Sequence, residues 1–554
     1  MPKQTQLNYK HYWILIAIVI LGGILRLVNL DLKNLGIDEV LTAIFSLGKS
    51  YQNIPKEIVF TPADLQNILR LNIETSCAEI AQNLIKESTH PPLFFCATNQ
   101  WLKLLNIFDL DLVWKLRSLP AILGIISIAL VYYLNRIAFS PLAGLMAATI
   151  MAFSPFGVYL SQEARHYTLP IVLITISLIC LIKIARSIEL EKPEQKYFWF
   201  IWIIANSISF YVHYFCLLAY AAQAIILATL IFKGRNYEKL KNKNKTIGAQ
   251  LFYLILPLIF LLPWLPILIE HFTNPKTGWL PAPEHIIPLL QTFLAWLLVA
   301  IALPLENQPR GMQIFMGILT ILFAIWFITK VSQGLKSIWK DKNTHKNTVI
   351  LASFVALVLL QFFVIIYILG KDITVAPRYH FIYYPAFCAL LGASLLGLKI
   401  KNKLQSERII IVAIVGLISC ILVINNIVLE KPYLPNLTAK IFARSSEPTM
   451  VVTGYNNSNE VALGISYGLA LDRIRSQSTA TYLAFLERDP SYNLMWQRLT
   501  QLKSSTIVNL WIVAPGLRQK EYPPKLQIGQ NKNCTLDPDN YYRVGIPYQL
   551  YICE

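Results

Sequence analysis

The sequence has few charged residues for its length. Asp, Glu, Lys and Arg make up only 14% of its 554 residues, whereas 55% are hydrophobic and the mean hydropathy is +0.49. Soluble domains carry more charge and have amphipathic helices, whereas helices in a bilayer are apolar on all sides. The composition therefore excludes an ordinary soluble protein and predicts a polytopic membrane protein.

Acidic residues are the scarcer of the charged groups, with 31 Asp and Glu against 49 Lys and Arg, which gives a net charge of +18. Such an excess can indicate a nucleic-acid partner, but here the basic residues occupy short loops between apolar runs. This placement is typical of cytoplasmic loops in membrane proteins. The clearest examples are Lys233–Arg235, Lys239–Lys245 and Lys330–Lys346. We therefore expect a membrane-lipid environment and no nucleic-acid partner.

Several other signals are missing. No small-residue cleavage site follows the first apolar run, Tyr12–Leu30, so we expect a retained anchor rather than a signal peptide. There is no inverted internal repeat of the kind that marks many transporters. The eight cysteines lack metal-binding spacing, and most lie in or near apolar runs, where we expect them to be packing residues. Cys534 and Cys553 lie in a polar region and could form a disulfide or stay unpaired; we favour the disulfide.

Apolar runs long enough to cross a bilayer occur eleven times. They cover about residues 12–30, 118–135, 141–160, 167–185, 197–213, 215–232, 251–269, 311–329, 349–369, 381–399 and 409–428. With the N-terminus inside, this count puts the lysine-rich loops on the cytoplasmic side. Two further runs, Pro91–Phe108 and Ile286–Leu303, are expected to be juxtamembrane or re-entrant helices on the outer face. If both crossed instead, Lys233–Lys245 would lie outside.

This topology predicts two domains. Residues 1–429 form an all-α membrane domain with a long first outer loop, 31–117, and residues 430–554 form a small extracytoplasmic α/β domain. In the latter, Met450–Gly454 and Thr506–Val513 have the pattern of buried strands, and Glu460–Arg473 and Tyr492–Leu502 that of helices.

The unusual polar residues gather on one side of this topology. Each lies at the outer end of a predicted span or in the first outer loop, where an ionisable side chain is a functional candidate. They are Asp38 and Glu39, His90, Arg117, Ser161–Tyr167, His213–Tyr214 and Pro377–His380.

Their chemistry suits an acid–base reaction at a phosphate. Asp38 could deprotonate an acceptor hydroxyl or hold a divalent cation. Arg117, Arg165 and Arg378 could bind phosphate oxygens, since guanidinium matches phosphate in a two-pronged geometry, and His90 could donate a hydrogen bond to the same phosphate. Taken singly, each motif has a plain structural explanation: a helix start, a surface ion pair, an arginine anchor or an interfacial aromatic. Together, in this order and on one side, they favour a site.

The order of these motifs resembles a known family. Arg26 lies in the first span and Asp38-Glu39 opens the outer loop. The motifs that follow are His90-Pro91-Pro92-Leu93, Leu116–Ala121, Ser154-Pro155, Ser161–Tyr167 and Arg378-Tyr379. This set is similar to the GT-C membrane glycosyltransferases of the protein O-mannosyltransferase (family 39) and aminoarabinose–lipid A transferase type. The resemblance is good over roughly the first 230 residues and loose to about residue 400.

The resemblance implies inverting transfer of a hexose or pentose from a polyprenyl-phosphate donor to an extracytoplasmic lipid, glycan or protein acceptor. It implies catalytic roles for Asp38, Glu39 and Glu163, with Asp38 the stronger candidate, and donor-phosphate binding by His90, Arg117, Arg165, Arg378 and Tyr379. We expect a bacterial inner-membrane protein whose site and C-terminal domain face the periplasm. Some relatives have Glu-Lys-Pro-Pro where this chain has Thr89-His90-Pro91-Pro92, which leaves the divalent cation, held by Asp38 or Glu163, in question.

Two other functions share parts of this pattern. A flippase or transporter of polyprenyl-linked glycans should carry ionisable residues near mid-membrane in broken helices, whereas these lie at one face. A lipid-A-type modifying enzyme or a ligase for larger glycans would share the mechanism and differ in substrate. No β-trefoil insertion is present, so protein O-mannosylation in particular does not follow.

Overall fold

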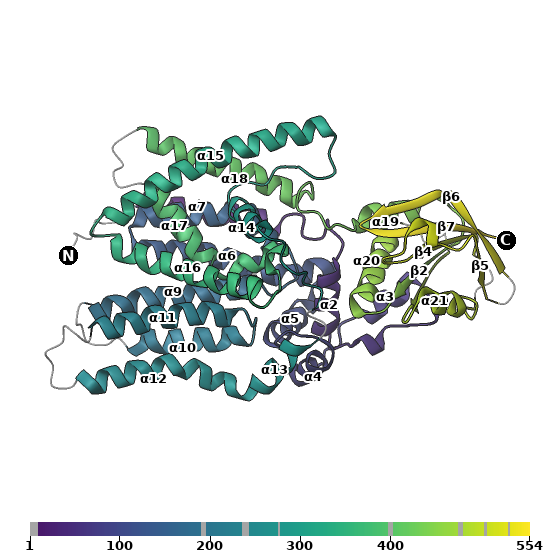
Figure 1. Cartoon of the computed structure of the whole chain (residues 1–554), viewed down its shortest axis with the longest axis horizontal. Coiled ribbons are helices and arrows are strands. Elements are labelled where there is room, and N and C mark those ends of the chain that lie inside the picture. Colours follow the sequence, from purple (N-terminus) through teal and green to yellow (C-terminus); the bar gives the residue numbers. More distant parts are fainter. Residues whose placement is uncertain are drawn as a thin grey trace. The chain divides into compact units, whose positions relative to one another are not determined.

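The computed structural model describes residues 9–189, 196–234, 243–274, 278–396, 403–474, 480–503, 507–529 and 532–554 (Figure 1). Contacts between residues divide the chain into two compact units. Unit 1 comprises Met1–Leu30, Ser88–Phe94 and Arg117–Val428, and unit 2 comprises Asp31–Glu87, Phe95–Leu116 and Leu429–Glu554. Of the predicted lysine-rich loops, Lys330–Lys346 is described, whereas residues 235–242 of Lys233–Lys245 lie outside the described residues.

Unit 1 is built of helices. Those that follow the predicted spans are α1 (Tyr9–Leu27), α6 (Leu112–Ala138), α7 (Pro141–Ala152), α8 (Pro155–Ser161), α9 (Thr168–Glu189), α10 (Lys196–Phe210), α11 (Cys216–Gly234), α12 (Lys243–Leu261), α15 (Arg310–Lys340), α16 (His345–Tyr367), α17 (Tyr384–Leu396) and α18 (Lys403–Ile424). Shorter elements connect them: η3 (Leu262–Trp264), α13 (Leu265–Thr273), α14 (Ile287–Leu297), η5 (Ile373–Val375) and η6 (Pro377–Ile382).

Each of the eleven predicted spans coincides with helix. In the described part of the chain, eight helices are long and apolar enough to cross a membrane, and the pair α7 and α8, bent by 60°, would be a ninth span. The remaining two predicted spans are shorter helices, α10 with 15 residues and α17 with 13. The runs expected to stay at the surface form α14 and α5 (Leu93–Leu104), of 11 and 12 residues, each too short for the roughly 20 that a crossing needs.

Close contacts through glycine hold the centre of unit 1 together. A Cβ on Gly392 of α17 would lie 2.6 Å from the Ala147 nitrogen of α7, and one on Gly334 of α15 would lie 1.9 Å from the Ser394 oxygen of α17. No larger residue fits at either position. Small residues let helix backbones approach closely in membranes, where dispersion contacts rather than the hydrophobic effect drive helix packing.

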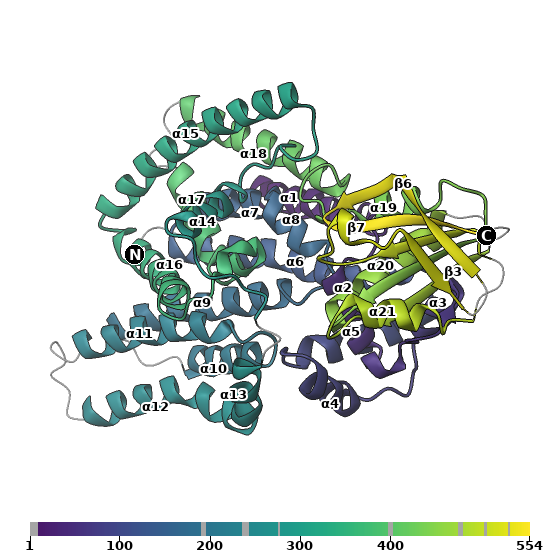
Figure 2. The same cartoon turned by 45° about the vertical axis from the view of Figure 1, so that its right-hand side comes forward.

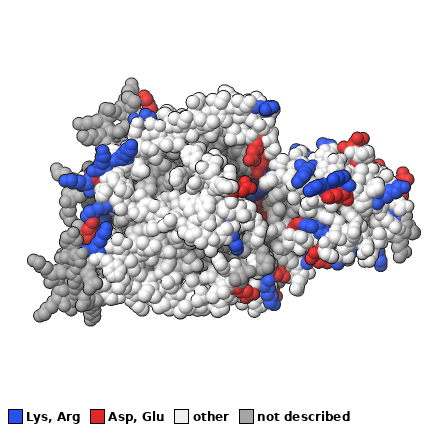
Figure 3. All heavy atoms as spheres, in the orientation of Figure 1, with Lys and Arg blue, Asp and Glu red and all other residues white. Residues whose placement is uncertain are grey.

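The two ends of the helices in unit 1 differ in charge. At one end, Lys346 at the start of α16 pairs with Glu189 at the end of α9, and Arg186 donates to the Ile137 carbonyl at the end of α6. Lys and Arg gather at that end and are sparse along the helices (Figure 3). The predicted polar residues Glu163, Arg165, His213 and Arg378 lie in connections at the opposite ends of these helices. The predicted separation of basic loops from site residues is therefore confirmed within unit 1.

Unit 2 contains a seven-stranded sheet of order β1-β3-β2-β4-β7-β6-β5, in which β2 is parallel to β3 and β4 and the other pairs are antiparallel (Figure 2). Its strands are β1 (Val59–Phe60), β2 (Thr449–Tyr455), β3 (Thr481–Glu487), β4 (Asn509–Val513), β5 (Lys525–Ile528), β6 (Lys532–Val544) and β7 (Ile546–Cys553), with helices α19 (Pro435–Phe442), α20 (Ser458–Ile474) and α21 (Tyr492–Leu499) and the turn η7 (Gln519–Glu521). The predicted small α/β domain is confirmed. Both predicted strands and both predicted helices are present.

Most of the first outer loop, Asp31–Glu87 and Phe95–Leu116, belongs to unit 2 together with the C-terminal residues, whereas Ser88–Phe94 belongs to unit 1. The part in unit 2 forms α2 (Ile37–Ser46), η1 (Tyr51–Asn53), β1, α3 (Pro62–Ile68), α4 (Cys77–Glu87), most of α5 and η2 (Leu105–Ile107). The sequence instead assigns this loop to the membrane domain. The reason for the difference is backbone pairing at a distance: β1 joins the sheet beside β3, and Ser466 of α20 donates to the Leu35 carbonyl at 2.6 Å.

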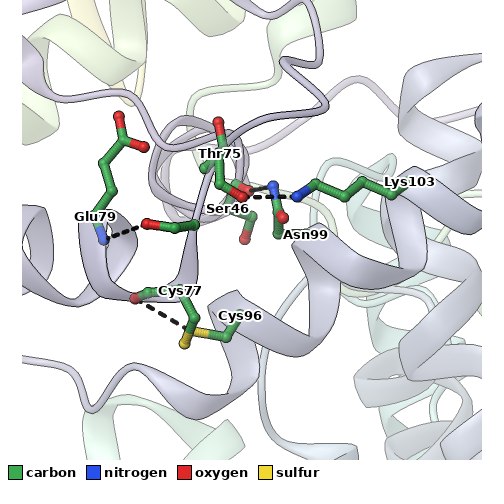
Figure 4. Close-up of a disulfide and its surroundings, with 8 residues drawn as sticks. Ser46, Thr75, Cys77, Glu79, Cys96, Asn99 and Lys103 are labelled. Carbon is green, nitrogen blue, oxygen red and sulfur yellow. Dashed lines mark hydrogen bonds between the residues drawn. A yellow bond between two sulfur atoms is a disulfide. The ribbon is translucent and has the colours of Figure 1, made fainter.

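Two disulfides lie in unit 2. Cys534 pairs with Cys553 across neighbouring strands β6 and β7, as expected from the sequence. Cys77 and Cys96 form a second disulfide, which joins α4 to α5, so the expectation that these two are packing residues is wrong (Figure 4). Around it, Asn99 donates to the Ser46 carbonyl at 2.8 Å and Lys103 donates to the Thr75 carbonyl at 2.7 Å. The other four cysteines are free thiols, buried in unit 1.

Candidate functional site

The segment Ser161–Tyr167 follows a break between two helices. Helix α7 ends at Ala152, and Ser154 then caps α8, its hydroxyl accepting the Gly157 N–H at 3.2 Å. Pro155 occupies the first turn of α8, where its missing N–H costs no hydrogen bond. This Ser-Pro pair therefore ends one helix and starts the next, and the 60° bend carries the chain into the segment that holds Glu163 and Arg165.

A second segment brings His90 to the same end of unit 1. The Leu93 N–H, just after the two prolines, donates to the Tyr211 carbonyl at the end of α10 at 3.1 Å. Phe94 packs in a small buried cluster with Leu173 and Val212. These contacts fix where the His90 segment lies against α9 and α10.

Four connections of unit 1 bring basic and aromatic residues together. The His166 ring centroid lies 5.1 Å from that of His90 and 4.8 Å from that of His213, and Arg165 Nη2 lies 3.2 Å from His90 Nε2. The Tyr379 ring packs edge-on against His213 at 6.1 Å, and the Arg378 guanidinium lies over the Tyr379 ring at 5.8 Å. We call these residues the histidine–arginine cluster: His90, Arg165, His166, His213, Arg378 and Tyr379.

Hydrogen bonds assign the tautomers of two of these histidines. Arginine can only donate, so His90 Nε2 accepts from Arg165, and His90 Nδ1–H then donates to the Ser88 hydroxyl at 3.0 Å. His213 Nδ1 accepts the Phe215 N–H at 3.0 Å, so its proton is on Nε2. The two histidines therefore differ in their hydrogen bonding: His90 Nε2 accepts from the Arg165 guanidinium, and His213 retains an N–H donor.

Burial and neighbouring charge keep the inner histidines neutral. Burial lowers the pKa of His166 well below its ordinary value, and the positive charges of Arg165 and Arg378 lower it further. The pKa of His213 is lowered well below its ordinary value for the same reasons. Both histidines lie in connections between helices. The positive charge of the cluster is therefore carried by its arginines, with neutral imidazoles between them.

This set of side chains suits an anion. Guanidinium groups and imidazole N–H groups bind phosphate through charge-assisted hydrogen bonds, and an arriving anion would offset the repulsion between the arginines. Among the residues that the structure describes, no three His, Cys, Asp or Glu gather in a way that could hold a metal ion.

Two further predicted residues lie in unit 1. Arg117, near the start of α6, is 2% exposed and donates to the Leu30 carbonyl just past α1 at 2.6 Å. Glu163 is buried in the same short connection as Arg165, whose N–H donates to the Glu163 carbonyl at 2.7 Å. The roles predicted for Arg117 in phosphate binding and for Glu163 in catalysis stay predictions.

The acidic pair lies in the first turn of α2, in unit 2. Glu39 is 1% exposed and its Oε2 accepts the Gly36 N–H at 2.9 Å, so this carboxylate caps the helix. The Tyr433 hydroxyl accepts the Ile37 N–H at 2.7 Å, which ties this helix start to the C-terminal part of unit 2. Asp38 is half-buried. The catalytic roles of Asp38 and Glu39 stay predictions. The two residues differ in that the Glu39 carboxylate is hydrogen-bonded to the backbone at Gly36.

The sequence places His166 and His213 among the polar residues gathered on one side but gives neither a specific role in the site. The plain explanation of His213 was an interfacial aromatic, but its side chain is only 8% exposed and lies inside the cluster. Both residues do stand in the motifs that the sequence singles out. What the sequence lacks is the packing that turns these rings toward His90 rather than toward lipid.

Comparisons with known proteins found a matching family model and solved structures of similar fold. Residues 89–267 match the family described as dolichyl-phosphate-mannose-protein mannosyltransferase. ArnT from Cupriavidus metallidurans bound to undecaprenyl phosphate is similar in structure over 97% of this chain and 98% of ArnT, with a TM-score of 0.51 and 11% identity. The apo state of that ArnT gives a TM-score of 0.51 and 11% identity over 92% of this chain and 94% of ArnT. AglB from Archaeoglobus fulgidus, in complex with an inhibitory peptide and a dolichol-phosphate, gives a TM-score of 0.44 and 11% identity over 91% and 69% of the two chains. No curated protein matches the sequence.

The class follows from the fold and from the matched segment together. The chain has the GT-C fold of membrane glycosyltransferases, and the family match spans the connections that hold His90, Glu163 and His213. It is an integral membrane glycosyltransferase. The match of residues 89–267 to the mannosyltransferase family and the ArnT-like fold agree with the resemblance seen in its ordered motifs.

Proposed function

We propose that this protein transfers a sugar from a polyprenyl-phosphate donor to an acceptor hydroxyl outside the cytoplasm, in a bacterial inner membrane. The observation that carries the proposal is the histidine–arginine cluster, which gathers Arg165, Arg378 and His213 at one end of the helical unit. We infer that the two guanidinium groups and the His213 N–H bind the donor phosphate. The similarity to ArnT, crystallised with undecaprenyl phosphate, supports a polyprenyl phosphate as the lipid.

The chemistry breaks the bond between the sugar C1 and the phosphate oxygen and forms one between C1 and the acceptor oxygen. The departing phosphate monoester gains negative charge, which Arg165 and Arg378 stabilise electrostatically. The proton of the acceptor hydroxyl passes to a carboxylate, for which we propose Asp38. Attack from the face opposite the leaving phosphate inverts the anomeric carbon.

Lipid attachment explains why such a site lies at the end of membrane helices. A polyprenyl chain keeps its phosphate at the membrane surface, so a receptor for that phosphate belongs at the depth where helices give way to loops. Unit 2 carries both disulfides and is proposed to face the periplasm, since disulfides persist in oxidising compartments.

The test is sugar transfer in membranes supplied with polyprenyl-phosphate sugars. Asp38→Asn keeps the size of the side chain and removes its basicity, so we expect transfer to fall by a factor of about 10²–10⁴ at unchanged expression. Glu39→Gln keeps an oxygen for the Gly36 N–H and is expected to retain most activity. Asp109→Asn, an exposed acid of the same unit, is the matched control.

Full activity of Asp38→Asn would remove Asp38 from the reaction. If wild-type membranes transfer no sugar from any polyprenyl-phosphate donor, the proposed donor class is wrong. Comparing the glycolipids and glycans of cells with and without the protein then identifies the sugar and the acceptor.

A further inference from the structure

The first span carries an arginine whose side chain lies wholly inside unit 1. Arg26 of α1 has no exposed surface. Its Nη2 donates to the Met151 carbonyl at 2.7 Å, and its Nη1 donates to the carbonyls of Ala152 at 3.1 Å and Gly22 at 2.9 Å. Met151 and Ala152 are the last residues of α7, whose carbonyls have no partner within that helix. Arg26 therefore caps the helix end just before the break, where the helix dipole favours a positive charge.

A second side chain makes the converse contact. Gln162, the residue after α8, is 4% exposed, and its Nε2 donates to the carbonyls of Val28 at 2.8 Å and Leu25 at 3.4 Å. These carbonyls lie at the end of α1. Thus Arg26 of α1 caps the end of α7, and Gln162, after α8, caps the end of α1. Each satisfies backbone groups that are buried away from water, where a missing partner is costly.

Three glycines make room for this arrangement. A Cβ on Gly124 of α6 would lie 3.0 Å from Arg26 Nε and 2.2 Å from Ser161 Oγ, and one on Gly157 would lie 3.3 Å from Arg26 Nη2. A Cβ on Gly22 would lie 3.0 Å from the Ala152 Cβ. The guanidinium therefore has a tightly fitted place formed by α1, α6 and α8, which a methyl group on any of these glycines would narrow.

We propose that Arg26 and Gln162 are a reciprocal pair of positioning residues that set the α7–α8 break and thereby the placement of Glu163 and Arg165. Glu163 follows Gln162 directly, and Arg165 is held to His90 only two residues further on. The proposal rests on the proposed function for its effect on transfer, and its structural part stands on the hydrogen bonds alone. We propose no contact of the pair with donor or acceptor; the pair acts through Glu163 and Arg165.

The structural part is tested without any substrate. Gln162→Met keeps the side-chain volume and removes both donated hydrogen bonds. Gln223→Met is the matched control, since Gln223 is fully buried in α11 and also makes two side-chain hydrogen bonds, to Trp202 and Ser177. In hydrogen–deuterium exchange of the purified protein, we expect Gln162→Met to speed exchange both at 153–167 and at 24–30, and Gln223→Met to change neither. Unchanged exchange in Gln162→Met would overturn the proposal.

The functional part is tested by binding of undecaprenyl phosphate and by transfer kinetics. Gln162→Met is expected to raise the Kd for that lipid and to lower kcat/KM on the order of 10–100-fold, because a displacement of about 1 Å at a site has that effect. Gly124→Ala, which removes no hydrogen-bonding group, should act in the same direction by displacing Arg26. Gln223→Met should lower the unfolding temperature to a similar degree while both functional readouts hold.

The outcomes separate the two proposals. If Gln162→Met and Gln223→Met lose activity in proportion to their unfolding temperatures, the pair has no positioning role. If wild-type protein neither binds the lipid nor transfers sugar, the proposed function fails, and the exchange experiment still decides whether the pair sets the break. Arg26→Lys combined with Gln162→Met should show less than the sum of the two single effects, since both changes release the same segment.

Discussion

Two buried histidines between arginines are the most unusual residues of the site. An imidazole whose pKa is lowered well below its ordinary value stays neutral at physiological pH, so His166 and His213 add hydrogen-bonding capacity without adding charge. A doubly protonated histidine pair would compete with the arginines for the same phosphate and would cost more to bury.

This neutrality has a consequence for stability. In the unfolded chain a histidine binds a proton below about pH 6.5, whereas buried His166 does not, so the unfolded state binds more protons as the pH falls. Stability is therefore full above about pH 6.5 and is lost on acidification, by up to about 1.4 kcal/mol per pH unit for each such histidine. We expect the unfolding temperature of the purified protein to fall between pH 7.5 and pH 5, and His166→Gln to reduce that fall.

A substitution of a buried residue that does not titrate provides the control. Gln223→Met should shift the unfolding temperature by the same amount at each pH. If the unfolding temperature falls equally with pH in wild type and in His166→Gln, His166 takes up its proton at the same pH in the folded and unfolded states, against the burial seen here.

How far the sequence reaches differs from residue to residue. The predicted topology places His90, Arg165 and Arg378 at one end of the membrane unit, because hydropathy and loop charge indicate on which side each connection lies. The orientation of the histidine rings could not be predicted from the sequence. Whether His213 faces lipid or His90 depends on tertiary packing, such as that of the neighbouring residues Phe94 and Val212. Glu39 is a similar case, since its capping bond to Gly36 uses the carboxylate that the motif offers for catalysis.

At the scale of elements, the long apolar helices were predictable and the pairing of the first loop was not. Eleven apolar runs give eleven stretches of helix because a membrane span must satisfy its own backbone. Strand β1 has only two residues, Val59 and Phe60, which pair with Leu483 and Ala484, more than 400 positions away. Nothing in so short a segment specifies its partner, so the join between loop and C-terminal domain appears only in three dimensions.

The Cys77–Cys96 disulfide illustrates the same limit and can be tested. Its cysteines stand in a helix start and an apolar run, which favoured packing, yet α4 and α5 bring them together. We expect alkylation of the denatured, unreduced protein to modify four of the eight cysteines, and all eight after reduction. Cys77→Ser with Cys96→Ser should give four labels before reduction and six after it.

Loss of this disulfide should also weaken unit 2. It closes a loop with a sequence separation of 19, for which the chain-entropy estimate is about 3 kcal/mol. We therefore expect a lower unfolding temperature for the double variant than for Cys180→Ala, which removes a free thiol and keeps both disulfides. Eight labels without reduction would show that neither disulfide forms in the expressed protein.

At the scale of the whole molecule, the two ends of the helical unit have opposite character. One end carries basic residues such as Arg186 and Lys346, and the other carries the histidine–arginine cluster. Helix α9, with 22 residues, spans roughly 33 Å between them, about the thickness of a hydrocarbon core. This separation is the physical basis for our proposal that the basic end faces the cytoplasm and the site faces the outside.

The orientation can be tested with the two ends of α15. Glu306 lies in the exposed connection before this helix and Lys342 in the exposed connection after it, and the 31 residues of α15 are long enough to cross a bilayer. We expect a membrane-impermeant maleimide to label Glu306→Cys in intact cells and Lys342→Cys only after permeabilisation, since the basic connection is retained inside. Labelling of both sites in intact cells would remove α15 as a span. The reverse pattern would place the histidine–arginine cluster in the cytoplasm, where a nucleotide-linked donor rather than a lipid-linked one would have to be considered.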